Sequence, residues 1–201
     1  MRLIGITGGV GAGKSEILSF IRKHYNCKIY LADEVAHLVQ QPGEKCYEEI
    51  VALLGEEILS EDGTIHRGKM AEAIFRDEEL LAGVNAIVHP AVKQYLIRAV
   101  EEAFKEGTVE LFFIEAALLI ECGYKDFVDE MWYIYASDEV RRQRLMQNRG
   151  YSPEKITRIM ESQLTDALFR ENADFVIDNS GTLSDAYNRI KERLEAYTWQ
   201  D

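Results

Sequence analysis

A glycine-rich octapeptide near the N-terminus has the clearest chemistry in this sequence. It consists of Gly8-Gly9-Val10-Gly11-Ala12-Gly13-Lys14-Ser15 and matches G-x-x-x-x-G-K-[ST] at every fixed position. An apolar segment, Arg2–Thr7, precedes it, and a helical pattern beginning at Glu16 follows it. Glycines let main-chain N–H groups approach phosphate oxygens, and a helix N-terminus adds positive charge. A glycine-rich turn without a ligand is therefore disfavoured.

The motif predicts binding of a nucleoside triphosphate with Mg²⁺. We expect the loop and Glu16 to hold the phosphates, Lys14 to reach the β and γ oxygens, and the Ser15 hydroxyl to ligate the metal. The motif does not define the reaction. A GTPase is disfavoured because no N-K-x-D segment is present and the D-x-x-G at Asp178–Gly181 follows the last predicted strand. A large mechanical ATPase is disfavoured by the length of 201 residues. A small kinase that transfers the γ-phosphoryl group remains.

An acid at the end of the second predicted strand is the candidate for the acceptor side. Lys28–Leu31 is followed by Ala32 and Asp33, and a helical pattern starts at Glu34. Ligands of parallel sheets bind outside the carboxyl ends of the strands, so Asp33 could orient or deprotonate an attacking hydroxyl. Asp is also favoured as a helix N-cap. Spacing alone does not choose between these roles.

Arginines gather in residues 138–172 of this otherwise acidic chain. Arg141 and Arg144 would share one face of a helix, and Arg149 lies just beyond. A guanidinium donates paired hydrogen bonds to phosphate and keeps its charge, which favours a lid over the triphosphate. The alternative is a solvated helix face paired with neighbouring acids. Arg144 and Arg149 are the predicted phosphate contacts. The region holds Arg141, Arg142, Arg144, Arg149, Arg158 and Arg170.

Other titratable side chains give weaker signals. Glu115 follows the third predicted strand, where P-loop proteins often carry an acid near Mg²⁺, although a surface acid fits equally well. Histidines and cysteines show no metal-ligand spacing, and the odd number of cysteines, three, without a C-x-x-C pair implies reduced thiols.

Alternation of strand-like and helical segments predicts an α/β fold with a five-stranded parallel sheet flanked by helices. Several strands are apolar at nearly every residue, as expected when helices cover both faces of a sheet. About 75 residues separate the second and third strands, which is too long for one crossover helix and predicts a helical insertion. The predicted strands are Arg2–Thr7, Lys28–Leu31, Val109–Ile114, Met131–Ala136 and Asp174–Ile177.

One domain over residues 1–201 is expected from the length. Its core would comprise residues 1–33, 107–137 and 173–201. Residues 34–106 would form the helical acceptor-binding insertion, and residues 138–172 the lid. The helical patterns of the insertion are Glu34–Gln41, Glu44–Leu54, Gly68–Phe75 and Glu78–Lys105.

Net charge limits the partners. The formal charge of −12 argues against nonspecific binding to nucleic acid or to anionic lipid, both of which need a cationic surface. No run of about 18 apolar residues and no cleavable signal pattern is present, so we expect a cytoplasmic protein without membrane contact. A monomer and a small homo-oligomer are both compatible with the sequence.

The order of these motifs resembles the dephospho-CoA kinase family, and the resemblance spans nearly the whole chain. Asp-Gly-Thr followed by His-Pro is the most specific later combination. The matching elements are Thr7 to Ser15, Ala32-Asp33, Asp62-Gly63-Thr64, Ile74-Phe75, Asn85, His89-Pro90, Leu118-Leu119 with Glu121, Arg144, Gln163, Ala173-Asp174 and Ile177-Asp178-Asn179.

This resemblance implies phosphorylation of the ribose 3′-hydroxyl of dephospho-CoA by ATP, the last step of coenzyme A synthesis. It also implies a fold similar to nucleoside monophosphate kinases, with a mobile lid. Asp33 matches the family's proposed base, and Thr7 lies beside the phosphate site. His89 matches a residue of the acceptor pocket, and Asn179 the region that holds adenine. From the residues alone, His89 is instead expected at a helix boundary, held extended by Pro90. Leu118 and Glu121 are further candidates for acceptor contacts, with a helix-face carboxylate as the alternative for Glu121.

Four positions depart from the family pattern. Leu31 replaces the first acid of an Asp-Ala-Asp triplet, and Ala117 replaces a proline. Phe169 stands where lysine is usual, and Asn148 precedes Arg149 where an arginine is expected. A kinase of another nucleotide or nucleoside, or a nucleotide-binding paralogue without catalysis, is therefore an alternative. Lys14, Ser15 and Asp33 occur together, which favours an enzyme over the paralogue.

Overall fold

A computed structural model of the chain describes residues 1–75 and 77–197. The last residues of the predicted core segment 173–201 therefore lie outside the described part. The chain forms two compact units, one of residues 1–29 and 107–201 and the other of residues 30–106. Within residues 1–75 and 77–197, no helix is long and apolar enough to cross a membrane.

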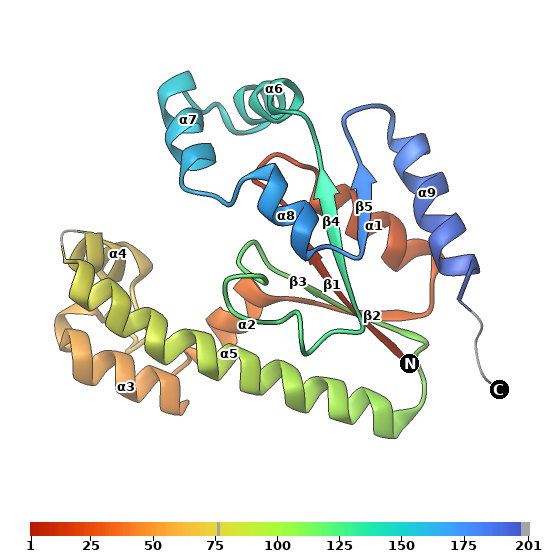
Figure 1. The fold of residues 1–201 in the computed structure, drawn as a ribbon. Coiled ribbons are helices and arrows are strands. Elements are labelled where there is room, and N and C mark those ends of the chain that lie inside the picture. Colours follow the sequence, from red (N-terminus) through yellow and green to blue (C-terminus); the bar gives the residue numbers. More distant parts are fainter. Residues whose placement is uncertain (76, 198–201) are drawn as a thin grey trace. The chain divides into compact units, whose positions relative to one another are not determined.

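A parallel sheet is the centre of the first unit (Figure 1). The strand order β2-β3-β1-β4-β5 confirms the predicted five-stranded α/β sheet for the described residues. The registers between β1 and β3, β1 and β4, and β4 and β5 are parallel. Observed bounds differ from the predicted ones by one or two residues, except for β1. The strands are β1 (Arg2–Thr7), β2 (Cys27–Leu31), β3 (Leu111–Glu115), β4 (Glu130–Tyr135) and β5 (Phe175–Asp178).

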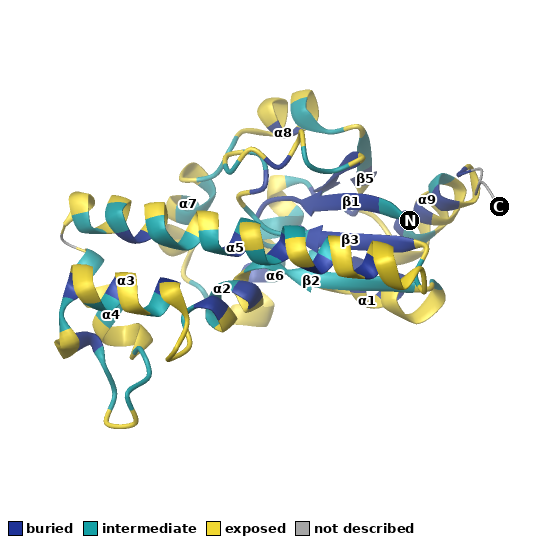
Figure 2. Ribbon diagram, turned by 90° about the horizontal axis from the view of Figure 1, so that it is seen from below, coloured by how far each residue is buried: buried dark blue, intermediate teal, exposed yellow. Residues whose placement is uncertain are grey.

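Neighbouring residues of β4 show that helices cover both faces of this sheet. Trp132 contacts Phe175 of β5 edge to face, and Arg193 of α9 (Leu183–Glu195) lies over the Phe175 ring at 5.4 Å. Tyr133 stacks on Phe169 of α8 (Asp166–Asn172) at 4.7 Å. Successive side chains of a strand point to opposite faces, so α8 covers the face opposite Trp132. Figure 2 shows β1 and β3 buried. Continuous apolar strands such as Leu111–Ile114 are the consequence.

The remaining helices of the first unit begin at side-chain caps or at glycine. The side chains of Ser137, Ser152 and Thr182 accept N-terminal hydrogen bonds in α6 (Asp138–Arg149), α7 (Pro153–Glu161) and α9 (Leu183–Glu195). α1 (Lys14–His24) begins two residues before the predicted Glu16, because Gly13 turns the chain with a φ of 89°. Phe20 of α1 stacks on Tyr187 of α9 at 4.0 Å.

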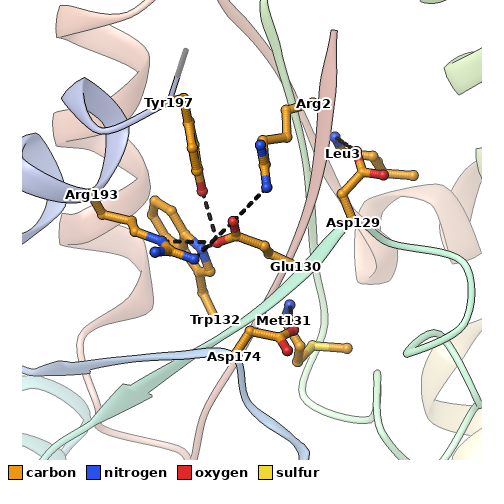
Figure 3. Close-up of polar contacts among 9 residues, drawn as sticks. All are labelled: Arg2, Leu3, Asp129, Glu130, Met131, Trp132, Asp174, Arg193 and Tyr197. Atoms are coloured by element: carbon orange, nitrogen blue, oxygen red, sulfur yellow. Dashed lines mark hydrogen bonds and ion pairs between the residues drawn. The ribbon is translucent and has the colours of Figure 1, made fainter.

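A buried carboxylate joins α9 to the start of β4 (Figure 3). The side chain of Glu130 is 4% exposed and lies 2.9 Å from both Arg2 and Arg193. Its other oxygen accepts hydrogen bonds from Trp132 Nε1 at 2.9 Å and from the Tyr197 hydroxyl at 2.8 Å. Opposite charges and these donors satisfy the carboxylate in a position where water cannot.

The second unit is helical. α2 (Ala32–Val39), α3 (Lys45–Leu54) and α4 (Arg67–Phe75) all pack on α5 (Glu78–Glu106), and a 3₁₀ turn spans Glu56–Ile58. α5 continues through Pro90, as the pattern Glu78–Lys105 predicts. The predicted bounds of α2, Glu34–Gln41, are wrong. The helix begins at Ala32, with the extended Leu31 as its N-cap, and ends at Val39.

Candidate functional site

The phosphate loop connects the end of β1 to the start of α1. Gly11 has a φ of 79° and Gly13 a φ of 89°, in the left-handed region that residues with a Cβ rarely adopt. A Cβ on Gly8 would collide with the carbonyl oxygen of Ile134. The glycines are therefore required by the path of the loop, and the loop ends at the positive N-terminus of α1.

Carbonyl groups of the loop are held by donors. Lys14 Nζ donates to the carbonyl of Gly8 at 2.8 Å, and the amide of Ala12 donates to the carbonyl of Gly9 at 3.1 Å. A phosphate binds N–H groups and is repelled by carbonyl oxygens. Carbonyls that already accept hydrogen bonds therefore repel a phosphate less, which favours binding of an anion to the remaining amides of the loop.

Side chains far along the sequence hold two more carbonyls of the loop. Arg141 Nε donates to the carbonyl of Val10 at 2.9 Å. Asn179 Nδ2 donates to the carbonyl of Ala12 at 2.8 Å, and Arg144 donates to the same oxygen at 3.3 Å. Helix α6 and the segment after β5 thus contact the loop.

Arg144 and Asn179, both predicted, also contact each other at this site. Arg144 donates to the main-chain carbonyl of Asn179 at 2.9 Å. Asn179 is fully buried, and its side-chain oxygen is buried without a hydrogen-bond partner. An unsatisfied acceptor of this kind is uncommon in a folded protein.

Arg141 and Gln163 were not among the predicted site residues. Gln163 Oε1 accepts hydrogen bonds from the Val10 amide at 3.1 Å and from Arg141 at 2.7 Å. The sequence signal for Arg141 was its spacing of three residues from Arg144 on one helix. Arg149, which was predicted, is exposed at the C-terminal end of α6. Its contact with a phosphate stays a prediction.

Lys14 and Glu115 place opposite charges beside the loop. Lys14 Nζ lies 3.5 Å from Glu115 Oε1, and both side chains are 15% exposed. Ser15 is the second residue of α1. A hydroxyl and a carboxylate are oxygen ligands of the kind that Mg²⁺ prefers, and the ion usually keeps several waters besides them. Among the described residues no group of three or more His, Cys, Asp or Glu could hold a metal by itself. The donor set therefore fits a Mg²⁺ ion that a nucleotide helps to bind.

The other predicted contacts of the first unit lie at the end of β1 and in the segment after β3. Thr7 is buried and its hydroxyl donates to the carbonyl of Ala117 at 3.3 Å. Leu118 is 48% exposed and Glu121 is exposed. Both belong to a series of turns, so the interpretation of Glu121 as a helix-face carboxylate is wrong. Their exposure leaves them accessible to a ligand.

Asp33 and His89 belong to the second unit. Asp33 lies exposed in the first turn of α2, so it neither ends the strand nor caps the helix. His89 is exposed within α5, one residue before Pro90, so the interpretation of His89 as a residue at a helix boundary is wrong. A separate cavity of about 550 Å³ between α3 and α5 is lined by neither residue. Its walls include Cys46, Ala52, Ile87, Ala91, Gln94 and Arg98.

Fold and site together define the class of this protein. A parallel α/β sheet with a complete phosphate loop between its first strand and first helix, and with arginines of a later helix on that loop, is a P-loop kinase. The model of the family described as dephospho-CoA kinase matches residues 2–185. The chain belongs to this family of phosphotransferases.

Individual relatives support this assignment along the full length. The chain is 34% identical over 200 residues to a dephospho-CoA kinase of Corynebacterium diphtheriae, covering 100% of this chain and 96% of the relative. The crystal structure of TT1252 from Thermus thermophilus has 29% identity and a TM-score of 0.81, with 98% of each chain covered. A dephospho-CoA kinase from Campylobacter jejuni has 23% identity and a TM-score of 0.73, over 97% of this chain and 96% of the other.

Proposed function

We propose that this protein transfers the γ-phosphoryl group of ATP to the ribose 3′-hydroxyl of dephospho-CoA and releases coenzyme A and ADP. The observation that carries the proposal is the match to the dephospho-CoA kinase family over residues 2–185, which includes an intact phosphate loop. In the reaction the acceptor oxygen bonds to the γ-phosphorus while the bond from that phosphorus to the β–γ bridging oxygen breaks. The hydroxyl proton leaves with a base.

The first unit supplies the donor side. Amides of the loop and of the start of α1 bind the β- and γ-phosphates, and Lys14 adds a positive charge beside them. Ser15 would hold a Mg²⁺ ion, with Glu115 close to its hydration shell, and the ion would neutralise developing negative charge. The hydrogen bond from Asn179 to the Ala12 carbonyl supports a role for that segment at the base of the nucleotide.

The second unit supplies Asp33 and His89 to the acceptor side, and the first unit supplies Leu118 and Glu121. Asp33 follows β2 by two residues, just as the phosphate loop follows β1, and its exposed carboxylate is available to accept the hydroxyl proton. We assign His89, Leu118 and Glu121 to acceptor binding, and Arg144 and Arg149 to the transferred phosphate. Residues 138–172 act as the lid in this proposal. We assign the protein to the cytoplasm, where thiols such as those of Cys27, Cys46 and Cys122 stay reduced.

Incubation with ATP, Mg²⁺ and a panel of nucleotide acceptors, read by mass spectrometry, tests the reaction. We expect one added phosphate on the ribose of dephospho-CoA. Another acceptor used in preference, or ATP binding without ADP formation, would refute the proposal.

Asp33→Ala tests the base, with the adjacent exposed acid Glu34→Ala as a matched control. We expect turnover to fall about 100-fold or more in Asp33→Ala, because general-base catalysis contributes that much, while ATP affinity stays unchanged. Glu34→Ala should keep its turnover. Near-normal turnover of Asp33→Ala would overturn the role of this residue.

A further inference from the structure

Two side chains from the region after β4 hold both main-chain polar groups of one loop residue. Arg141 Nε donates to the Val10 carbonyl at 2.9 Å, and Gln163 Oε1 accepts from the Val10 amide at 3.1 Å. Arg141 also donates to that same Gln163 oxygen at 2.7 Å. The three groups therefore form a closed ring of hydrogen bonds, which we call the Val10 clamp.

Local packing keeps the arginine of the clamp in one place. The Arg141 side chain is 12% exposed, and Asp138 Oδ1 lies 3.7 Å from its guanidinium. The guanidinium occupies the space that a Cβ of Gly9 would need. Gly9 is not a fixed position of the G-x-x-x-x-G-K-[ST] motif, so its lack of a side chain here is explained by the arginine rather than by phosphate.

The clamp restricts which amides are available to a phosphate. The Val10 amide is already engaged by Gln163 and the Ala12 amide by the Gly9 carbonyl, while the carbonyls of Gly8 and Ala12 accept hydrogen bonds from side chains. We propose that Arg141 and Gln163 are positioning residues that fix the phosphate loop to helix α6 and to the segment after α7, so that the triphosphate binds loop amides after Val10 other than that of Ala12. The proposal rests on the nucleotide site assigned above.

Coupling between the two side chains is the distinctive consequence. Because both act on Val10 and on each other, removing either one opens the ring, and removing the second then costs little more. A guanidinium that only attracted phosphate through its charge would not depend on Gln163 in this way. Two independent structural contacts would give additive losses.

A double-mutant cycle with two measurements tests the clamp. The variants are Arg141→Met, Gln163→Met and the double variant, with Arg142→Met as the matched control. Arg142 belongs to the same helix but donates to Thr157 of α7 at 2.8 Å. ATP affinity is measured by calorimetry with Mg²⁺ present, and exchange of the Val10 amide is measured by NMR without nucleotide.

We expect Arg141→Met and Gln163→Met each to bind ATP about fivefold more weakly than the wild type. The double variant should bind ATP no more than about twofold more weakly than either single variant. The control Arg142→Met should bind ATP as the wild type does. The Val10 amide should exchange faster in Gln163→Met and regain protection in Gln163→Glu, which restores an acceptor. The clamp would be overturned by additive losses of ATP affinity in the double variant, by an unchanged ATP affinity in Gln163→Met or by an equal loss in Arg142→Met. Unchanged exchange of the Val10 amide in Gln163→Met would also overturn it. Failure of the wild type to bind ATP would instead overturn the proposed function, since the exchange measurement reads the clamp without nucleotide.

Discussion

Replacing Glu130 by glutamine tests the buried polar cluster that joins α9 to the sheet (Figure 3). Glu130 is 3% exposed, and its two oxygens accept hydrogen bonds from Arg2, Trp132, Arg193 and Tyr197. Glutamine keeps the shape but replaces one oxygen with an NH₂ group. Donors would then face donors, and the two arginines would lose their counter-charge.

The structure sets the size of the expected loss. A hydrogen bond to a charged group contributes about 1.5–3 kcal/mol, and breaking a buried ion pair costs about 3–5 kcal/mol. The side chains of Arg2 and Arg193 are 40% and 35% exposed, so water compensates part of their charge. We therefore expect the lower end, about 3 kcal/mol of unfolding free energy, which corresponds to a fall of about 9 °C in Tm at this chain length.

The same cluster predicts how the loss depends on pH. Burial of Glu130 raises its pKa, but hydrogen bonds from Trp132, Tyr197 and Arg193 outweigh burial and lower the net pKa below the usual value. A carboxylate whose pKa is depressed in the folded state stabilises the protein fully at pH values above its pKa in the unfolded chain, which is about 4.3 for Glu. This stabilisation disappears as the pH falls through the folded-state pKa. The difference between wild type and Glu130→Gln should be constant from pH 6 to 8 and shrink below about pH 4.

Urea unfolding followed by circular dichroism measures this difference at each pH. Glu192→Gln, which removes an exposed carboxylate from the same helix, is the control and should change the unfolding free energy by less than about 0.5 kcal/mol. A loss below about 1 kcal/mol in Glu130→Gln, or a loss that persists undiminished in acid, would show that the cluster does not hold α9 as argued.

Three further substitutions examine the phosphate loop, helix α8 and helix α6. Gly13→Ala should weaken ATP binding at least about tenfold in a titration, because φ is 89° and the new Cβ collides with the Asn179 amide; unchanged affinity would contradict this account of the loop. Phe169→Ala should lower the unfolding free energy by about 3–5 kcal/mol in urea, because the ring is 2% exposed and stacks on Tyr133; a loss under about 1 kcal/mol would count against it. Arg144→Met should raise the KM for ATP about tenfold, and a normal KM would exclude its placement at the nucleotide.

Local sequence carried most of the information about the fold. The alternation of apolar strands and helical patterns predicted the parallel sheet, because both faces of β3 and β4 are covered and almost every residue there is apolar. The phosphate loop was equally readable, since Gly11 and Gly13 meet a requirement of their own backbone. The start of α2 was misplaced by two residues, because the extended Leu31 serves as N-cap without a side chain that signals it.

The surroundings of the loop were decided by the tertiary structure. Arg144 and Arg149 are five residues apart, which turns a helix by about 140° beyond a full rotation, so the two cannot share one face. In the structure Arg141 and Arg144 of α6 contact the loop, and Gln163 contacts it from beyond α7. The contact of Arg149 with a phosphate stays a prediction. The sequence determined where the phosphate loop lies because its geometry is local. Only long-range packing determined which distant side chains hold it, since contacts across more than a hundred residues leave no fixed spacing in the chain.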